Sequence, residues 1–311
     1  MKMNGKRIRI VKHFCVSLIF LSVFFYSQIN AYENCDVLYT MVNVCGKNSQ
    51  GDAHILKFGN GTVYAIDAGM AGDTGGKRVV AYLMKNRIDK IDKYFITHAH
   101  KDHYGGLVDL LNSSIRIREI YLNVPEKTVC DQEQPWGCDY SHFIKLLHQI
   151  KKRNIKIKSI HTGDRFNPTQ TAEILVLSAH NGMDKPIGKT DINDTSIVMK
   201  LTNGAQSILF TGDLNKITGD FLTRNYSDEL KADILKVPHH GTRSTVNNHF
   251  FDTVQAKIAL VPSPASLWGS KGSLRIKQYF NDKNVRVYVS GIEGDVSVLI
   301  WKDKYRIISN E

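Results

Sequence analysis

Four side chains of types that bind metal ions are concentrated in the segment Thr97–His103, which reads Thr-His-Ala-His-Lys-Asp-His. Three imidazoles and one carboxylate suit zinc, manganese or iron, since the cluster contains no thiolate. The segment follows an apolar run that predicts a buried strand, and loops after strands commonly carry binding and catalytic residues. Because His98 and His100 can point to one side and Asp102 and His103 to the other, the spacing favours two neighbouring metal ions.

This H-x-H-x-D-H pattern, followed by two glycines, resembles the metal-binding motif of the metallo-β-lactamase-fold hydrolases. Further segments resemble other motifs of that family in the same order along the chain: Gly51–Leu56, Tyr64–Gly69, Leu209–Asp213 and Val237–Gly241. The resemblance extends from about residue 38 to the C-terminus. It implies an α/β (α+β) protein folded as a four-layer αββα sandwich.

The resemblance also implies a set of metal ligands. These are His98 and His100 at the first ion, Asp102 and His103 at the second, Asp213 bridging both, and His240 as the final ligand. His239 is then a candidate proton donor or phosphate contact, although either histidine of this pair could be the ligand. Asp102 and Asp213 join His239 as catalytic candidates. Asp67, at a strand end, is a candidate to orient a histidine ligand, or else it caps a turn.

The third ligand of the first ion has two sets of candidates. Many family members place a histidine well before the bridging aspartate, where this chain has Asp191–Ser196. His180 lies further back and ends an apolar strand, which is a good position for a ligand. Either His180 completes the site, or Asn193 or Asp194 approaches the metal ion.

The Asn-Asp-Thr-Ser segment indicates a branch of the family. With Thr211–Asp213 and Pro238–Thr242, it resembles the hydrolase domain of bacterial DNA-uptake (competence) channel proteins and their stand-alone secreted relatives. Bacterial phosphorylcholine esterases share this arrangement. One departure is Trp268–Ser273, which stands where that branch often has Gly-His-Pro, so substrate handling could differ. The channel's membrane helices are absent, and we do not expect the chain to conduct DNA.

The resemblance implies a hydrolase with two divalent metal ions, Zn²⁺ by availability or Mn²⁺ as in some nucleases. Two such ions lower the pKa of a bridging water towards about 7, and the resulting hydroxide would attack the phosphorus of a phosphodiester, possible substrates including DNA. Arg243, Lys271, Tyr104 and Asn193 are candidate substrate contacts. The alternatives are a lactam, lactone or thioester hydrolase, a phosphorylcholine esterase, and a non-catalytic binding module. Asp213 stands where zinc β-lactamases usually have cysteine.

The first 31 residues predict a signal peptide. Five basic residues and no acid accompany the apolar stretch Phe14–Tyr26, and Ile29–Ala31 suits cleavage, so residues 32–311 form the expected hydrolase domain. The stretch is shorter than the roughly 20 residues of a spanning helix, which makes an uncleaved anchor the weaker interpretation. We expect a periplasmic or secreted protein without a membrane span after cleavage. Its oligomeric state is not predicted.

Export bears on charge and on the cysteines. Removing the five basic residues lowers the net charge from +11 to +6, which permits a polyanionic substrate. The four remaining cysteines allow three disulfide pairings. The local one joins Cys35 to Cys45 and Cys130 to Cys138, whereas zinc binding by these thiols is less favoured because no C-x-x-C pair occurs.

Short apolar strands alternate with amphipathic helices along the chain, a pattern typical of layered α/β architecture. The apolar fraction of 42% is enough for one large core. The clearest helices span residues 76–86, 142–153, 244–251 and 273–280. Asn203-Gly204 predicts a hairpin between two strands. These elements must bring the metal-binding loops to one place.

Overall fold

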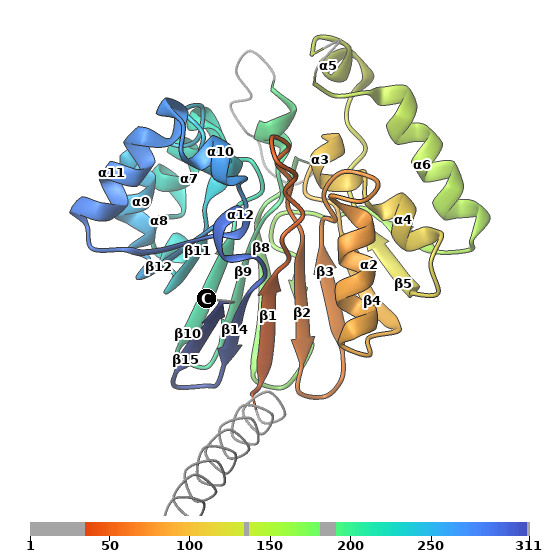
Figure 1. Ribbon diagram of the computed structural model, residues 1–311, viewed down its shortest axis with the longest axis horizontal. Coiled ribbons are helices and arrows are strands. Elements are labelled where there is room, and N and C mark those ends of the chain that lie inside the picture. The colour runs from red at the N-terminus through yellow and green to blue at the C-terminus, as the bar shows by residue number, and fades with distance from the viewer. Residues whose placement is uncertain (1–34, 134–136, 181–190, 310–311) are drawn as a thin grey trace, which may run out of the picture.

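The computed structural model describes residues 35–133, 137–180 and 191–309. The predicted signal peptide, residues 1–31, lies outside these ranges. In the described chain two β-sheets face each other, and helices cover the outer side of each (Figure 1). This arrangement confirms the predicted αββα sandwich. Within the described ranges, no helix combines the length and apolar character needed to cross a membrane.

The first sheet has eight strands in the order β15-β14-β1-β2-β3-β4-β5-β6. Their bounds are β1 Val37–Met41, β2 His54–Phe58, β3 Val63–Ile66, β4 Lys90–Phe95, β5 Arg116–Tyr121, β6 Lys156–Lys158, β14 Val296–Ile300 and β15 Tyr305–Ser309. The helices on this side of the chain are α2 Gly76–Lys85, α3 Lys101–Tyr104, α4 Leu107–Leu111, α5 Lys127–Asp131 and α6 Tyr140–Lys152. Buried side chains of α2, α4 and α6 pack on the outer face of the sheet.

The second sheet has seven strands in the order β13-β12-β11-β10-β9-β8-β7. Their bounds are β7 Arg165–Phe166, β8 Ala172–Ser178, β9 Val198–Asn203, β10 Gln206–Phe210, β11 Ile234–Lys236, β12 Ile258–Val261 and β13 Arg286–Val289. The remaining helices are α7 Lys216–Asn225, α8 Ser227–Leu230, α9 Asn248–Val254, α10 Ala265–Trp268, α11 Leu274–Asp282, α12 Ser290–Glu293, and the short 3₁₀ turns η2 Ile192–Thr195, η3 Pro238–Gly241 and η4 Lys271–Ser273. Buried residues of α7, α9 and α11 cover its outer face.

The strands β3 and β12 are apolar throughout because both of their faces are buried. Successive side chains of a strand point to opposite faces. In β3, Val63 and Ala65 pack under the helices, while Tyr64 and Ile66 face the second sheet. In β10, Leu209 packs under helices and its neighbours face the first sheet. Continuous apolar runs are typical of such doubly covered strands.

The pairing of the strands brings several loops to one edge of the sandwich. Strand β3 runs parallel to β4, and β10 runs parallel to β11. The loops that follow these four strands include Asp67, His98, Asp213 and His240. Strand β2 is antiparallel to β3, so Asp52, just before β2, lies at the same edge.

Two sequence predictions need correction, and two are confirmed. Cys130 and Cys138 form the expected disulfide, whereas Cys35 and Cys45 are buried and are not joined by a disulfide. These two flank β1, and a strand of that length alone spans about 17 Å, beyond the reach of a disulfide. The helix expected at residues 244–251 begins at Asn248, because Thr245 instead forms a β-bridge with Asn215. The hairpin expected at residues 203–204 joins β9 to β10.

Candidate metal centre

His103 is held by a buried carboxylate at the end of β3. Asp67 adopts a left-handed backbone (φ 56°) and accepts hydrogen bonds from the Thr97 amide at 2.9 Å and from His103 Nδ1 at 2.8 Å. Because a carboxylate only accepts, Nδ1 must carry the proton, which leaves Nε2 as a lone pair. That Nε2 is buried without a hydrogen-bond partner, although Asp213 Oδ2 lies 3.3 Å away.

His240 is presented in the same way from the second sheet. Its Nδ1 donates to the Pro262 carbonyl at 2.8 Å, so Nε2 is again a buried lone pair without a hydrogen-bond partner. Nε2 lies 3.1 Å from Asp213 Oδ2 and 3.3 Å from Asp102 Oδ2. Three successive left-handed residues, His239 to Gly241, make the turn that aims the ring. At Gly241 a Cβ atom would meet the Trp268 ring at 2.8 Å, so only glycine fits.

His98 and His100 face each other. His98 Nε2 and His100 Nδ1 are 3.2 Å apart. The Thr97 hydroxyl donates to Asp67, so it accepts from His98 Nδ1 at 3.1 Å. His100 Nε2 lies 2.8 Å from the Glu133 carboxylate, to which it donates. Both facing nitrogens therefore keep their lone pairs, an arrangement that a cation satisfies.

Four imidazole lone pairs thus converge beside two carboxylates. The residues are His98, His100, His103, His240, Asp102 and Asp213. Nitrogen and oxygen donors of this kind suit Zn²⁺ or Mn²⁺. Nε2 of His103 and Nε2 of His240 are buried without a hydrogen-bond partner, which is normally unfavourable. Binding to a metal ion would satisfy both atoms. The geometry brings together the predicted ligands of both ions, and their assignment to ions stays a prediction.

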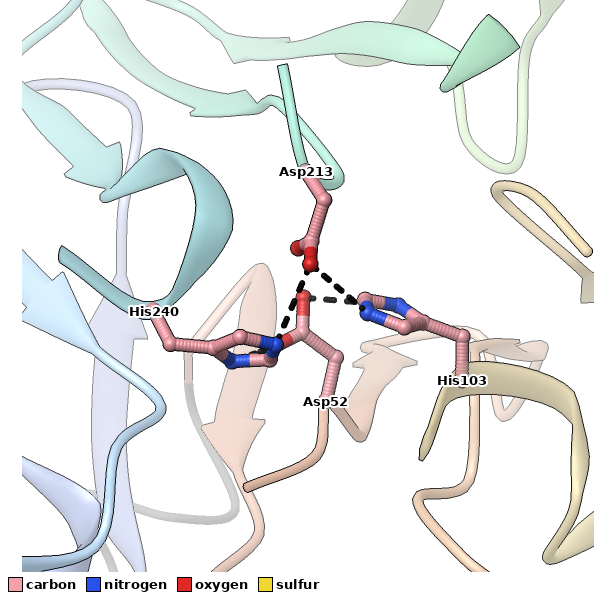
Figure 2. A group of neighbouring side chains, drawn as sticks. All are labelled: Asp52, His103, Asp213 and His240. Atoms are coloured by element: carbon pink, nitrogen blue, oxygen red, sulfur yellow. Dashed lines mark ion pairs between the residues drawn. The ribbon is translucent and has the colours of Figure 1, made fainter. Parts of the chain in front are cut away.

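Asp52 belongs to the same cluster but faces the other side of the rings (Figure 2). One atom each of Asp52, His103, Asp213 and His240 lies within 4.8 Å of the others. However, Asp52 Oδ1 lies 3.3 Å from Nδ1 of His240, the nitrogen turned away from Asp213. Asp52 also pairs with the Lys236 ammonium. We therefore interpret Asp52 as a support for the histidines rather than as a ligand.

Lys236 is a fully buried cation at the end of β11. Its ammonium donates to the Gly212 carbonyl at 2.7 Å and lies 3.5 Å from Asp213 Oδ1, besides contacting Asp52. Burial would lower the pKa of Lys236, but these carboxylates outweigh it and raise the pKa. The lysine therefore stays charged and offsets part of the negative charge of the site.

The two groups of histidines differ in their electrostatics. Burial disfavours a charged ring at His103 and His240, yet Asp213 and the other carboxylates raise both pKa values well above the usual range. At His98, burial and then the neighbouring histidines lower the pKa well below it. The pKa of Asp213 is low despite burial, because His240 and His103 stabilise its charge. In the metal-free chain, His103 and His240 therefore take up a second proton at Nε2, which a bound metal ion would displace. At His100 burial is likewise outweighed, and Glu133 and Asp102 raise the pKa.

His239 belongs to a different hydrogen-bond network from His240, one that runs through Asn215 to Asp191. Its Nδ1 lies 2.8 Å from Asn215 Oδ1, and Asn215 Nδ2 donates to Asp191 at 2.6 Å. Burial lowers the pKa of His239, while Asp213 opposes that shift. The ring is half-buried, in contrast to His240, which is fully buried. Its role as a proton donor or a phosphate contact stays a prediction.

The other predicted residues lie in varied places. Tyr104 is fully buried, with its hydroxyl 3.0 Å from His142 Nδ1, so it lies in the core rather than at a surface that a substrate could contact. Arg243 is exposed in a turn, and Lys271 is exposed at the start of η4. Asn193 is buried in η2, with Oδ1 lacking a hydrogen-bond partner. His180 is half-buried directly before residues 181–190, which lie outside the described ranges, and its role as third ligand stays a prediction.

Sequence reasoning did not identify Asp52, Lys236, Glu133 or Asn215 as parts of the site. A lysine inside the apolar run of β11 was a signal, since buried lysines need a charged partner. Asp52 stood in a segment quoted only for its likeness to a strand. Glu133 and Asn215 carried no local signal, because only the tertiary fold brings them to the histidines.

Comparisons with known proteins agree with this geometry. The family profile described as Metallo-beta-lactamase superfamily matches residues 46–263. ComE operon protein 3 of Bacillus subtilis (strain 168) is 25% identical over 187 residues, covering 60% of this chain and 22% of that protein. Competence protein ComA of Neisseria gonorrhoeae is 24% identical over 214 residues, covering 68% of this chain and 24% of that protein. The chain thus spans about a quarter of these relatives.

A solved structure shows the same fold. CmlA, a diiron beta-hydroxylase from Streptomyces venezuelae, superposes with a TM-score of 0.50 at 13% identity, covering 88% of this chain and 54% of that chain. The predicted resemblance to competence proteins is confirmed by the two sequence relatives. At this level of identity, the structural likeness concerns the fold alone.

Proposed function

The chain belongs to the metallo-beta-lactamase superfamily, and we propose that it is an exported binuclear-metal hydrolase that cleaves phosphodiesters. The observation that carries the proposal is two neighbouring pairs of imidazole nitrogens: His98 Nε2 faces His100 Nδ1, and His103 Nε2 and His240 Nε2 both face Asp213. Each ring is fixed by a hydrogen bond at its other nitrogen, and such support is typical of metal-binding histidines.

We assign metal binding, proton transfer and phosphate binding to different residues of the chain. His98 and His100 would hold one ion, Asp102, His103 and His240 the other, and Asp213 faces both groups. When bound, two divalent ions would acidify a water molecule and polarise the attacked phosphoryl group. His239 donates its Nδ1 proton to Asn215, so its Nε2 would first take up a proton from solvent and then give that proton to the leaving oxygen. Arg243 and Lys271 are exposed cations suited to hold phosphate charge.

DNA is the phosphodiester that we favour. The relative named a competence protein supports a nucleic acid, and the resemblance to DNA-uptake proteins points the same way. The net charge of +11 over the whole chain permits a polyanionic substrate. Export is supported by the Cys130–Cys138 disulfide, since disulfides persist mainly in oxidising compartments.

The test is a substrate comparison with metal-depleted protein. Zn²⁺ or Mn²⁺ is added back stepwise, and hydrolysis of linear DNA, bis-p-nitrophenyl phosphate and nitrocefin is followed in parallel. We expect metal-dependent cleavage of DNA and of the small diester, with nitrocefin intact. Cleavage of the small diester alone would redirect the search to phosphocholine compounds. Cleavage of nitrocefin alone, or no hydrolysis with metal bound, would contradict the proposed phosphodiesterase.

A further inference from the structure

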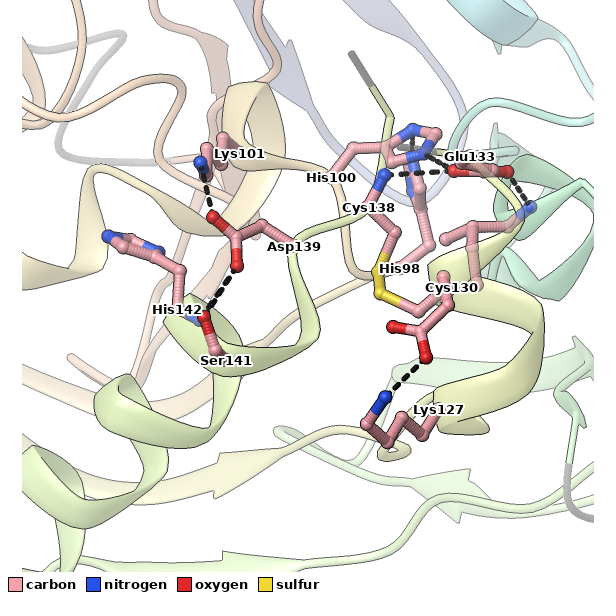
Figure 3. Close-up of a disulfide and its surroundings, with 12 residues drawn as sticks. His98, His100, Lys101, Lys127, Cys130, Glu133, Cys138, Asp139, Ser141 and His142 are labelled. Atoms are coloured by element: carbon pink, nitrogen blue, oxygen red, sulfur yellow. Dashed lines mark hydrogen bonds and ion pairs between the residues drawn. A yellow bond between two sulfur atoms is a disulfide. The ribbon is translucent and has the colours of Figure 1, made fainter. Parts of the chain in front are cut away.

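Glu133 lies beside the metal centre, in the loop that the Cys130–Cys138 disulfide closes (Figure 3). Its carboxylate accepts three hydrogen bonds. Oε2 accepts from His100 Nε2 at 2.8 Å and from the Cys138 amide at 3.0 Å, and Oε1 accepts from the Ile192 amide at 2.7 Å. The side chain is only 14% exposed. A carboxylate with this many donors has one fixed orientation.

The contact with His100 determines which nitrogen can bind a cation. Because Glu133 can only accept, the proton of the neutral ring sits on Nε2, and Nδ1 keeps its lone pair. Nδ1 is the atom that faces His98 Nε2. Glu133 lies on the far side of the ring from that pair, so it is placed to orient His100 and not to share the same ion.

The loop holds the motif at a second point. Asp139, directly after Cys138, accepts from the Lys101 ammonium at 2.9 Å. Lys101 follows His100 in the chain. Glu133 in the loop and Asp139 next to it therefore contact two successive residues of the H-x-H-x-D-H motif. Through Ile192 it also contacts η2, which carries Asn193. Among the described residues, the disulfide is the covalent bond that closes this loop on itself.

We propose that Glu133 is a positioning residue that fixes His100 for metal binding, and that the Cys130–Cys138 disulfide holds Glu133 in place. This inference rests on the proposed metal centre and deepens it. It makes the first ion depend on a loop outside the two sheets. The second ion, bound by Asp102, His103 and His240, does not depend on that loop.

The experiment measures metal binding rather than activity. Metal-free protein with its disulfide intact is titrated with Co²⁺ in competition with a chelator, and the d–d absorption reports the ligands of each ion. Glu133→Ala should weaken one of the two ions by about 10- to 100-fold and leave the other within about twofold. Glu133→Gln retains an accepting oxygen for His100, and it should recover most of the lost affinity.

The disulfide is tested by a thermodynamic cycle. Cys130→Ser/Cys138→Ser should weaken the same ion, by less than Glu133→Ala does. In the Glu133→Ala background the same cysteine changes should have no further effect, because residues that act through one another are not additive. Glu119→Ala is the matched control. Glu119 has a side chain 10% exposed and bonded to Lys93 and Lys158, away from the histidines. It should lower stability without changing metal affinity.

The outcomes separate this inference from the proposed function. Two ions bound with normal affinity and spectrum in a folded Glu133→Ala variant would overturn the positioning role. Additive effects of the cysteine and Glu133 changes would overturn the role of the disulfide. If Glu133→Ala fails to fold, Glu133→Gln decides through its Co²⁺ spectrum, which must be that of the wild-type protein. Failure of the wild-type protein to bind any ion would contradict the proposed function itself.

Discussion

The two sets of predicted ligands are supported in different ways. The first set, His98 and His100, is oriented by a threonine hydroxyl and by Glu133 in a disulfide-closed loop. The second set, Asp102, His103 and His240, is supported by buried groups at the edges of both sheets, among them Asp67, the Pro262 carbonyl and Asp52. The second set is therefore oriented by residues of the two sheets, whereas His100 of the first set is oriented by the loop that the Cys130–Cys138 disulfide closes.

Charge divides the histidines differently. Burial disfavours a charged ring at His103 and His240, yet carboxylates raise both pKa values, and Lys236 balances those carboxylates. In the first set, burial and the neighbouring histidines lower the pKa of His98, so this ring is neutral. Burial also disfavours a charged ring at His100, but Glu133 and Asp102 outweigh it and raise the pKa. The first set therefore combines one neutral ring with one ring in a charge-assisted hydrogen bond.

Asp213→Ala should have the largest effect, because its carboxylate acts on both sets. The carboxylate lies 3.3 Å from His103 Nε2 and 3.1 Å from His240 Nε2 in the second set, and its charge opposes the lowering of the His98 pKa in the first. We expect a loss of turnover of about a thousandfold or more, equivalent to about 4 kcal/mol, with fewer ions bound per chain. Elemental analysis and diester hydrolysis measure both. Asp233→Ala, at the Lys257 ion pair, is the control. Normal turnover in Asp213→Ala would rule out a shared role.

Asp52→Ala should destabilise the metal-free protein by about 3 to 5 kcal/mol, because it leaves the Lys236 ammonium buried with less compensation. Ser196→Ala, on the side of the first set, should cost only about 1 kcal/mol through lost hydrogen bonds. Chemical denaturation measures both free energies of unfolding. If both variants lose the same free energy of unfolding, the two sets of ligands are supported equally strongly and the proposed difference is wrong. The double change Asp52→Ala/Lys236→Met should recover part of the stability.

The contributions of His103 and His98 to the pH dependence of the metal-free protein should have opposite signs. The folded pKa of His103 is raised, so its contribution to stability is complete below the unfolded pKa of about 6.5 and is lost as the pH rises through the folded value. His98 has a lowered pKa, so its contribution is present above about 6.5 and is lost as the pH falls. Unfolding free energies from pH 5 to 9 should fall at the alkaline end, and His103→Gln should flatten that slope. If the slope of unfolding free energy against pH is unchanged in His103→Gln, the raised pKa does not belong to His103.

Arg243→Ala should have the smallest effect, since this exposed side chain supports neither set. If Arg243 holds a phosphate, its removal should weaken DNA binding uniformly across sequences and reduce the slope of log affinity against log salt by about 1. Filter binding at several salt concentrations measures that slope. An identical slope would exclude Arg243 from the phosphate contacts. Metal content should remain at the wild-type level.

The sequence predicted the sandwich and the residues that gather at the candidate site because both depend on local patterns. The H-x-H-x-D-H motif places its side chains within one loop, and the apolar runs of β3 and β10 predict strands directly. The pairing of Cys35 with Cys45 was wrong, because nearness in sequence does not bring residues together across an intervening strand.

The supporting residues could not be predicted in this way. Glu133, Asn215 and Lys236 lie in segments far apart in the sequence, and only the packing of two sheets and a loop brings them to the site. Tyr104 follows the motif directly, yet α3 turns it into the core. A local pattern predicts which side chains bind, while long-range contacts determine which side chains orient them.

The most direct test of the account is the position of the ions themselves. Crystals grown with Zn²⁺ would be measured at the zinc absorption edge, where anomalous scattering locates each ion. The account predicts two ions, one about 2.0–2.1 Å from His98 Nε2 and His100 Nδ1, the other at the same distance from His103 Nε2 and His240 Nε2, with Asp213 between them. Ions at the Nδ1 atoms of His103 or His240, or beside Asp52 alone, would contradict it.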